Sequence, residues 1–378
     1  MGSRFGLDLV YPLETDGVTA SQAVADIIFV HGLFGNPRYT WTGKRTDQKT
    51  KKTEDVFWIQ QLLPAVLSNA RIFTWGYDAG VTRLFSNSSQ ATIFEHSRTL
   101  LSDIADSRMT EEDEKRGIIF VAHSLGGALV KDALNFSQSE RTHLSKILPA
   151  TIGVIFLGTP HRGSTSASMG KWAFEVTRVL AKKPNTALLR DLERSSETLD
   201  RIGQGFSQLI GDKRIKIQSF YEELHMKGLM VRAQQAVESW IQLTFKQVVD
   251  RASYAIWDAS EIAIGIPADH SAMTKFASLS DVGFKRVSAV LRRWTIEFVN
   301  AHPSKQWPSL TAMEDLSAAA ANSSKIETVW LEIFILQKHN NCPFPVNAYD
   351  EVLNSVVFSY ASQALTTCFS LSIKPQSS

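Results

Sequence analysis

The stretch GIIFVAHSLGGALVKDAL, from Gly117 to Leu134, decides the fold. Its apolar first half ends at Ser124, and a helical pattern begins directly after that serine. Ala122 and Gly126 lie two residues on either side of Ser124, so both of these neighbours are small. A serine between small residues, where a strand passes into a helix, is typical of a nucleophile elbow. The pattern therefore predicts that Ser124 is a nucleophile held at the tip of a sharp turn.

The crowding of that turn explains its small residues. A backbone strained enough to push a hydroxyl out above the sheet edge brings the residues two before and two after it together, so large side chains there would clash. Ala122 and Gly126 avoid that clash, and Gly127 allows the new helix to pack closely. The helix also points its backbone dipoles at the serine oxygen.

Short apolar runs alternate with helical stretches along most of the chain. The runs are rich in Ile, Val and Phe and are continuously apolar, which favours strands buried on both faces of a parallel sheet. The predicted strands are Phe5–Val10, Asp26–His31, Arg71–Trp75, Gly117–Ala122, Thr151–Leu157 and Ile215–Phe220. The predicted helices are Val56–Leu67, Ala91–Ser107, Gly126–Phe136, Lys171–Ala181 and Thr186–Ile210. Strands that alternate with helices predict an α/β fold with right-handed crossovers.

One segment between two strands is too long for a simple crossover. Residues 165–212 are mostly helical in pattern. In an α/β enzyme such a segment either covers the site as a lid or thickens the helical layer. A second helical pattern, from Ala233 to Phe245, places its apolar residues on one stripe that suits packing on the body.

A serine hydroxyl needs a base, and its reaction needs a stabiliser of the oxyanion. The strand at Asp26–His31 ends in His-Gly, and the loop after such a strand donates one backbone N–H to the oxyanion. We therefore expect the N–H groups of Leu33 and of Leu125, the residue after the serine, to form the oxyanion hole. Three further residues are expected to line the site: His31, Gly32 and His123.

The base should come last in the chain order serine, acid, histidine. Four histidines come late enough in the chain: His225, His270, His302 and His339. His270 fits best because a polar loop with Gly265 and Pro267 precedes it and a helical pattern follows it. His161 precedes every candidate acid, so we expect it to line the site without acting as the base.

The acid should lie directly after the strand at Ile215–Phe220, in the sequence FYEEL. Glu222 is the first candidate and Glu223 the second, because successive residues of a strand face opposite ways and only one of them can reach the histidine. Asp250 is the alternative candidate for the acid if the acid lies later in the chain.

The sequence gives little support to other kinds of site. Lysine and arginine total 40 against 38 acidic residues, a net charge of +2, which predicts no nucleic-acid surface. The segment GTPHRGST has Ser164 where a phosphate-binding loop needs lysine, and the chain has no GxGxxG dinucleotide motif. It also lacks the HExxH and CxxC patterns of metal sites, and the serine chemistry requires neither a cofactor nor a metal.

The composition favours an intracellular, cytoplasmic protein. Cys342 and Cys368 are too few for a disulfide scaffold, which fits a reducing compartment. The N-terminal residues lack the apolar run of a secretory signal, and no run reaches the roughly 18 apolar residues of a membrane span.

Several motifs, taken in order, resemble a known family. These motifs are ADIIFVHGLFGNP, FTWGYDA, IIFVAHSLGGALVKDAL, FLGTPHRGS, SFYEEL and PADHSAMTKF. Together they resemble the serine-active-site-containing α/β-hydrolases, which are lipase-like serine esterases. The match is closest to fungal members and more distant to the GPI inositol deacylases, and it extends from Phe5 to about Asn300.

The resemblance implies an α/β-hydrolase fold over residues 1–302. Such a fold has a mostly parallel central sheet, helices on both faces and, in this family, a helical insertion between the sixth and seventh strands. The resemblance also implies hydrolysis of carboxylic esters, of lipid or acyl type, through an acyl-enzyme, with Ser124, His270 and Glu222 as the triad. It allows peripheral contact with a membrane and association with mitochondria or the endoplasmic reticulum.

Two features depart from the family pattern. Residues 232–247 look inserted between EELHMKGLMV and VVDRASYAIWDASE, where the acid and the histidine must meet. The tail at residues 303–378, expected to be partly helical or disordered, shows no partner domain. The insertion keeps a second hypothesis open, namely a catalytically inactive hydrolase-like module for recognition or signalling.

Overall fold

The computed structural model of the 378-residue chain describes residues 5–13, 23–79, 89–159, 186–213, 215–224 and 262–302. Every described residue belongs to the first of the two units into which the chain divides, Met1–Ala320 and Ala321–Ser378. Several predictions lie outside the described residues: the helix Lys171–Ala181, the segments 165–185, 232–247 and 303–378, and the side chains of His161 and Asp250.

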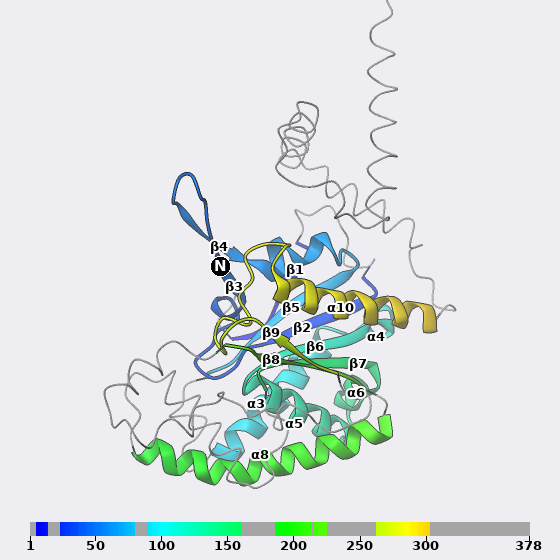
Figure 1. The fold of residues 1–378 in the computed structure, drawn as a ribbon. Coiled ribbons are helices and arrows are strands. Elements are labelled where there is room, and N and C mark those ends of the chain that lie inside the picture. Colours follow the sequence, from blue (N-terminus) through cyan, green and yellow to red (C-terminus); the bar gives the residue numbers. More distant parts are fainter. Residues whose placement is uncertain are drawn as a thin grey trace, which may run out of the picture. The chain divides into compact units, whose positions relative to one another are not determined.

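A seven-stranded sheet forms the centre of the molecule, in the order β1-β5-β2-β6-β7-β8-β9 (Figure 1). Its strands are β1 (Gly6–Tyr11), β2 (Ala25–Val30), β5 (Ala70–Gly76), β6 (Gly117–His123), β7 (Thr151–Leu157), β8 (Lys216–Glu222) and β9 (Ile262–Ile266). β1 pairs antiparallel with β5, and every other pair of neighbours in this sheet is parallel. The mostly parallel sheet predicted from the continuously apolar runs is therefore confirmed.

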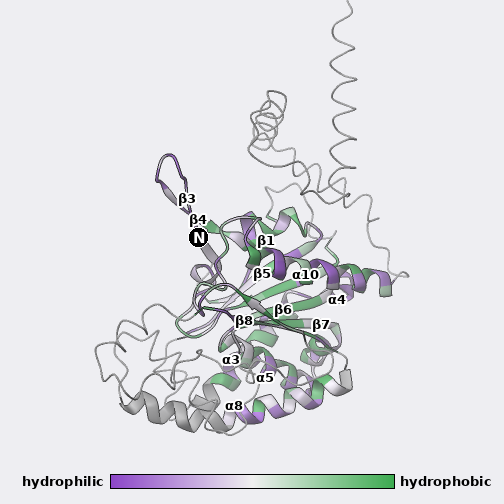
Figure 2. Ribbon diagram, in the orientation of Figure 1, coloured by the Kyte–Doolittle hydropathy of each residue, from purple (hydrophilic) through white to green (hydrophobic). Residues whose placement is uncertain are grey.

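The sheet is buried on both faces. Along β6, Ile118, Phe120 and Ala122 belong to one hydrophobic cluster, whereas Ile119 and Val121 belong to the other. Successive residues of a strand point to opposite faces, so a strand that must bury both faces has no polar positions to alternate. Figure 2 shows this directly, because the central strands are hydrophobic and the surrounding helices are mixed.

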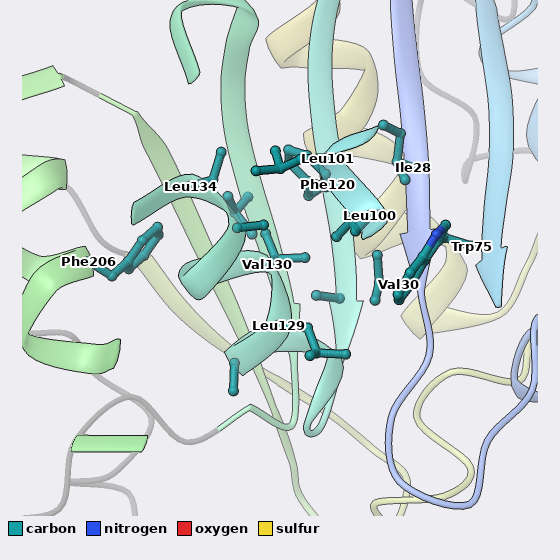
Figure 3. Packing of buried hydrophobic residues seen from close by; sticks show 14 of the residues in the cluster. Ile28, Val30, Trp75, Leu100, Leu101, Phe120, Leu129, Val130, Leu134 and Phe206 are labelled. Carbon is teal, nitrogen blue, oxygen red and sulfur yellow. The ribbon is translucent and has the colours of Figure 1, made fainter. Parts of the chain in front are cut away.

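Helices cover both faces of the sheet. On one face lie α3 (Ser89–Asp106), α5 (Gly126–Ser139) and α8 (Thr186–Lys213), and on the other lies α10 (Val282–Ala301). Figure 3 shows the first layer, in which Phe120 of β6 packs among Leu101 of α3 and Val130 of α5. The remaining short helices are η3 (Tyr39–Trp41), α1 (Trp58–Gln61), η4 (Leu63–Ala65), α4 (Glu111–Lys115), η5 (His143–Lys146) and α6 (Ile147–Ala150). This sheet order and these two helical layers are those of the α/β-hydrolase fold.

The described part of the long insertion belongs to the helical layer. Leu199, Ile202 and Phe206 of α8 are buried in the same cluster as the α5 residues. The insertion lies between β7 and β8, which are the fifth and sixth strands of the sheet in chain order. The insertion is predicted between the sixth and seventh strands of the sheet. In the described sheet it follows the fifth strand, because a single described strand, β1, precedes β2.

The predicted helix Val56–Leu67 is wrong over most of its length. Residues up to Phe57 form β4 (Thr53–Phe57), which pairs with β3 (Thr42–Thr46) as an antiparallel hairpin. The helix that follows ends at Gln61, and Pro64 lies in the first turn of η4. Proline has no N–H to continue an α-helical hydrogen-bond series, so it ends the helix early. The hairpin was missed because its strands are mostly polar and exposed.

Two elements at the end of the described chain are not among the predicted strands and helices: β9 (Ile262–Ile266) and α10 (Val282–Ala301). β9 is only five residues long, IAIGI, and pairs in parallel with β8. The helical pattern expected after His270 is present as α10, which packs Val287, Leu291 and Trp294 against the sheet. These two elements bracket the loop that carries His270 and so fix its place beside β8.

Candidate active site

Ser124 has the backbone geometry of a nucleophile elbow. It follows the last residue of β6, and α5 begins two residues later at Gly126. Its φ is +54°, in the left-handed region that a residue with a side chain adopts at a cost of 1–3 kcal/mol or so. Its N–H donates to the carbonyl oxygen of Leu157 at 2.9 Å, and its own carbonyl accepts the hydroxyl of Thr159 at 2.9 Å. Contacts with the segment after β7 therefore hold the strained turn.

The elbow lies hard against the end of β2. β2 and β6 run in register from Ala25 beside Gly117 to Val30 beside Ala122, so they end side by side. A Cβ added at Gly126 would lie 2.5 Å from the carbonyl oxygen of His31. A Cβ added at Gly32 would lie 2.6 Å from the Cβ of Ser124. Both glycines are thus required because the two loops meet at backbone contact.

The loop after β2 presents an amide that can bind an oxyanion. The carbonyl of Gly32 accepts the N–H of Gly35 at 3.0 Å and lies 3.1 Å from Nδ1 of His31. In a trans peptide the N–H points away from the carbonyl, so fixing this carbonyl also fixes the direction of the Leu33 N–H. Within the described ranges, neither the Leu33 N–H nor the Leu125 N–H donates to a protein acceptor. Among the described residues, both predicted oxyanion-hole amides are therefore without a protein acceptor.

His31 supports this loop as a neutral ring. It stacks on Tyr77, with ring centroids 4.5 Å apart and planes 8° from parallel. The Tyr77 N–H donates to Nε2 of His31 at 3.4 Å, so the ring hydrogen is on Nδ1 and is donated to the Gly32 carbonyl. Burial lowers the pKa of His31 to about 4, so the ring carries no charge near neutral pH.

His270 and Glu222 meet at the carboxyl end of β8. Nδ1 of His270 lies 3.6 Å from Oε1 of Glu222, and both side chains are almost completely buried. This distance is longer than a hydrogen bond and is close enough for a carboxylate to stabilise an imidazolium. Gly158, with a φ of +58°, makes room for the ring, because a Cβ there would lie 2.9 Å from Nδ1 of His270.

The other candidates for acid and base lie elsewhere. Glu223, the neighbour of Glu222, faces Arg286 at 3.7 Å and has a partly exposed side chain. His302 lies at the end of α10, where its Nδ1 is 2.8 Å from the carbonyl oxygen of Phe298. The remaining alternatives, Asp250, His225 and His339, lie outside the described residues, as does His161, which is expected only to line the site.

The serine hydroxyl is buried, and Oγ of Ser124 forms no hydrogen bond with any residue in the described ranges. The structure therefore brings the elbow and the Glu222–His270 pair to the same sheet edge without a formed serine–histidine hydrogen bond. Catalytic hydrogen bonds are often long in ligand-free enzymes and shorten in the substrate complex. All of these groups follow the carboxyl ends of parallel strands, which is where open α/β sheets bind ligands.

Three contributors to the site were not assigned a role from the sequence. Tyr77 stacks on His31, Thr159 binds the elbow carbonyl, and Gly158 accommodates the imidazole. All three directly follow strands of the sheet, β5 for Tyr77 and β7 for the other two. Their position at the carboxyl ends of strands is the one signal in the sequence that could have singled them out.

In the described part of the chain, no group of three His, Cys, Asp or Glu side chains is arranged to hold a metal ion. None of the described helices has the length and apolarity needed to cross a membrane.

Comparisons with known proteins give distant relatives. No protein-family model matches the chain. The chain is 29% identical over 226 residues to Protein SERAC1 of Danio rerio, and 26% identical over 230 residues to Protein SERAC1 of Homo sapiens. Each alignment covers 57% of this chain and 33% of the relative, so the chain spans about a third of the length of these curated relatives.

Solved structures similar to the chain include two bacterial esterases. The esterase domain of a Rhodothermus marinus protein has a TM-score of 0.39 and 16% identity, covering 78% of this chain and 94% of that chain. Est1E from Butyrivibrio proteoclasticus has a TM-score of 0.38 and 10% identity, with the same two coverages.

Proposed function

We propose that this chain is a serine hydrolase that cleaves carboxylic esters through a Ser124–His270–Glu222 triad. The single observation that carries the proposal is the position of Ser124. Its strained backbone, with a φ of +54°, stands at the same sheet edge as a buried histidine–carboxylate pair. Strain of this kind persists only where the surrounding structure enforces it, and it is concentrated at functional sites.

The proposed reaction proceeds in two halves. Oγ of Ser124 attacks the acyl carbon of the ester while Nε2 of His270 takes the hydroxyl proton, and the carbonyl electron pair moves onto the oxygen. The amides of Leu33 and Leu125 bind that oxyanion, and the collapse of the intermediate expels the alcohol, which takes the proton from His270. Water then repeats the sequence on the acyl-enzyme and releases the acid. Loss of one such amide donor typically costs about 3 kcal/mol in the barrier.

The protonation states of the surrounding groups support His270 as the proton acceptor. Burial lowers the pKa of His31 to about 4 and the pKa of His123 well below its ordinary value. Neither ring therefore takes up a second proton near neutral pH. Glu222 lies beside His270, so a positive charge that forms on that ring during the reaction is stabilised by a carboxylate. A proton taken from Ser124 is therefore directed to His270.

We further propose that the substrate is a lipid or another acyl ester and that the chain belongs with the serine-active-site-containing hydrolases. Support comes from the motif resemblance and from the identity of 26–29% to the SERAC1 proteins. The relation to fungal members and to GPI inositol deacylases rests on the motifs alone.

A series of p-nitrophenyl esters with increasing acyl length tests the activity. We expect wild-type protein to hydrolyse at least one ester, Ser124→Ala to reduce kcat to background, and the matched variant Ser139→Ala to retain it, because Ser139 is exposed at the end of α5. Hydrolysis that survives Ser124→Ala would refute the proposed nucleophile. The acyl length with the highest kcat/KM defines the substrate class.

One observation favours the alternative hypothesis of an inactive module: the Ser124 hydroxyl has no hydrogen bond to His270 in this structure. A variant that lacks residues 232–247 separates the two hypotheses. Hydrolysis only in the shortened protein would show that this form is inactive, whereas equal kcat in both proteins would exclude the inactive module.

A further inference from the structure

His123, the residue directly before the proposed nucleophile, is bonded to the backbone of the proposed base. Its Nε2 lies 3.0 Å from the carbonyl oxygen of His270, and the contact is buried. A carbonyl oxygen only accepts hydrogen bonds, so Nε2 of His123 carries the hydrogen and donates it. The hydrogen bond joins β6 to a loop 147 residues further along the chain.

The ring of His123 is packed from two sides. Its centroid lies 4.9 Å from the centroid of the His270 ring, with the planes inclined by 40°. On the other side, Nδ1 of His123 would lie 3.2 Å from a Cβ added at Gly32. The imidazole thus stands between the loop of the base and the loop of the oxyanion hole. Rotation of the ring would break its hydrogen bond to the His270 carbonyl.

The His123 ring is neutral, so its one N–H stays on Nε2, where it donates to the His270 carbonyl. Burial lowers the pKa of the ring well below the ordinary value and the charge of His270 lowers it further, and these effects outweigh the hydrogen bond to the His270 carbonyl, which raises it. The neutral ring has one N–H, and the acceptor at Nε2 fixes which nitrogen carries it.

The rest of the base loop is held from another direction. The indole N–H of Trp58 donates to the Thr274 carbonyl at 2.8 Å, and the hydroxyl of Thr274 donates to the Thr40 carbonyl at 2.9 Å. These bonds anchor the loop four residues beyond His270, on the η3 and α1 side. The bond from His123 anchors it at His270 itself, on the side of the elbow.

We propose that His123 is a positioning residue that sets the His270 imidazole beside Ser124 by holding the His270 carbonyl. This inference rests on the proposed hydrolase function. The distance between a nucleophile and its base controls the rate steeply, and a misplacement of about 1 Å can cost about 100-fold. The effect should therefore fall on kcat and on the reactivity of Ser124, whereas KM should change little because the buried His123 ring acts through the His270 carbonyl.

Two substitutions separate the hydrogen bond from the packing. In His123→Gln the terminal amide nitrogen occupies about the position of Nε2 and can donate the same bond. In His123→Phe the ring volume is kept and the donor is lost. We expect His123→Phe to lower kcat and the maximal rate of phosphonylation by a fluorophosphonate about 100-fold, with KM within about threefold. We expect His123→Gln to recover most of that loss, and His143→Phe, a change at an exposed histidine, to have no effect.

The outcomes are distinguishable. Equal rates in wild-type protein and His123→Phe, or equal losses in His123→Phe and His123→Gln, would overturn the positioning role while leaving Ser124 as the nucleophile. Absence of phosphonylation in folded wild-type protein would refute the hydrolase itself. ¹⁵N spectra of histidine-labelled protein give a test that needs no activity. We expect the signal lost in His123→Gln to be that of a neutral ring protonated at Nε2, and an Nδ1-protonated ring would overturn the inference.

Discussion

Ser124 keeps a backbone conformation that only its neighbours make tolerable. A φ of +54° suits glycine, and serine adopts it here because Leu157 and Thr159 bind its backbone from β7 and beyond. The Ser124 hydroxyl itself forms no hydrogen bond with the described residues, so the strain is not offset by its own side chain. The strained turn therefore gains no stability from the serine hydroxyl among the described residues.

Relief of this strain is measurable. We expect Ser124→Gly to raise the free energy of unfolding by about 1 kcal/mol relative to Ser124→Ala, because glycine adopts a positive φ without a steric penalty. Urea unfolding of both variants tests this. The same pair at Ser207, an exposed residue within α8, should give the opposite sign, since glycine destabilises a helix by about 1 kcal/mol relative to alanine. Equal stability of Ser124→Gly and Ser124→Ala would show that the turn is not strained.

Gly158 controls the space for the base. An added methyl group would stand 2.9 Å from Nδ1 of His270 and would occupy a backbone with a φ of +58°. We expect Gly158→Ala to lower the phosphonylation rate of the folded protein at least about tenfold, because the ring must shift. Gly211→Ala is the control, since nothing lies within 4 Å of the position where its Cβ would be added. An unchanged rate in Gly158→Ala would show that the ring is not confined there.

At the scale of elements, the two ends of the sheet have different tasks. The carboxyl ends of β2, β6, β7, β8 and β9 carry the candidate site, and the opposite ends of β5, β2 and β6 carry a buried ionic cluster. Asp26 at the start of β2 binds Arg71 of β5 through two bonds of 2.7 and 3.0 Å. Arg108 also binds this carboxylate, and Nε of Arg116 lies 3.3 Å from it. One carboxylate therefore holds together the starts of three adjacent strands.

Removal of that carboxylate should destabilise the sheet strongly. We expect Asp26→Asn to lower the free energy of unfolding by about 3–5 kcal/mol, because buried Arg108 loses its carboxylate partner, and Arg71 and Arg116 keep only that of Asp113. Thermal or urea unfolding measures the change. Asp55→Asn is the matched control, since Asp55 pairs with Lys44 on an exposed hairpin and such pairs contribute less than about 1 kcal/mol. A loss at Asp26 no larger than the loss at Asp55 would show that the cluster does not hold the strands.

Elements also mark where sequence reasoning succeeds and where it fails. The strands of the parallel sheet could be predicted, because burial on both faces leaves a continuous apolar run such as GIIFVA. The β3–β4 hairpin could not, because exposed polar strands carry no such run. The helix after β4 is shorter than predicted, because Pro64 cannot continue the α-helical hydrogen-bond series. Local sequence patterns predict buried strands well and predict exposed polar strands poorly.

The candidate site shows the same limit over long distances. The elbow is a local pattern, so Ser124 and Gly126 could be singled out from six residues. Alternation of side chains along a strand indicates only that one of Glu222 and Glu223 reaches the histidine, and the family resemblance favours Glu222. The bond from His123 to His270 spans 147 residues and has no counterpart in any local pattern. Contacts of that kind depend on which strand ends the fold brings together.

At the scale of the whole molecule, buried neutral histidines make stability depend on pH. Burial lowers the pKa of His31 to about 4, whereas an unfolded histidine titrates near 6.5. The unfolded state therefore binds more protons than the folded state between these values, so stability is full above about pH 6.5 and is lost as the pH falls toward 4. The lowered pKa of His123 acts in the same direction.

Replacement of one of these rings should reduce that dependence. We expect wild-type protein to lose about 1 kcal/mol more than His31→Asn when the pH is lowered from 7.5 to 5.5, because asparagine does not titrate. Its amide can still donate to the Gly32 carbonyl in place of Nδ1. Urea unfolding at both pH values gives the difference. An equal or larger loss in His31→Asn would show that the His31 ring is not held neutral by burial.

The most direct measurement maps the covalent adduct of a fluorophosphonate by peptide mass spectrometry. We expect the phosphonyl group on Ser124 in wild-type protein, a rate lowered about 100-fold or more in His270→Gln, and no adduct in a folded Ser124→Ala variant. An adduct on another residue, or a folded wild-type protein that forms none, would contradict the assignment of Ser124 as the nucleophile.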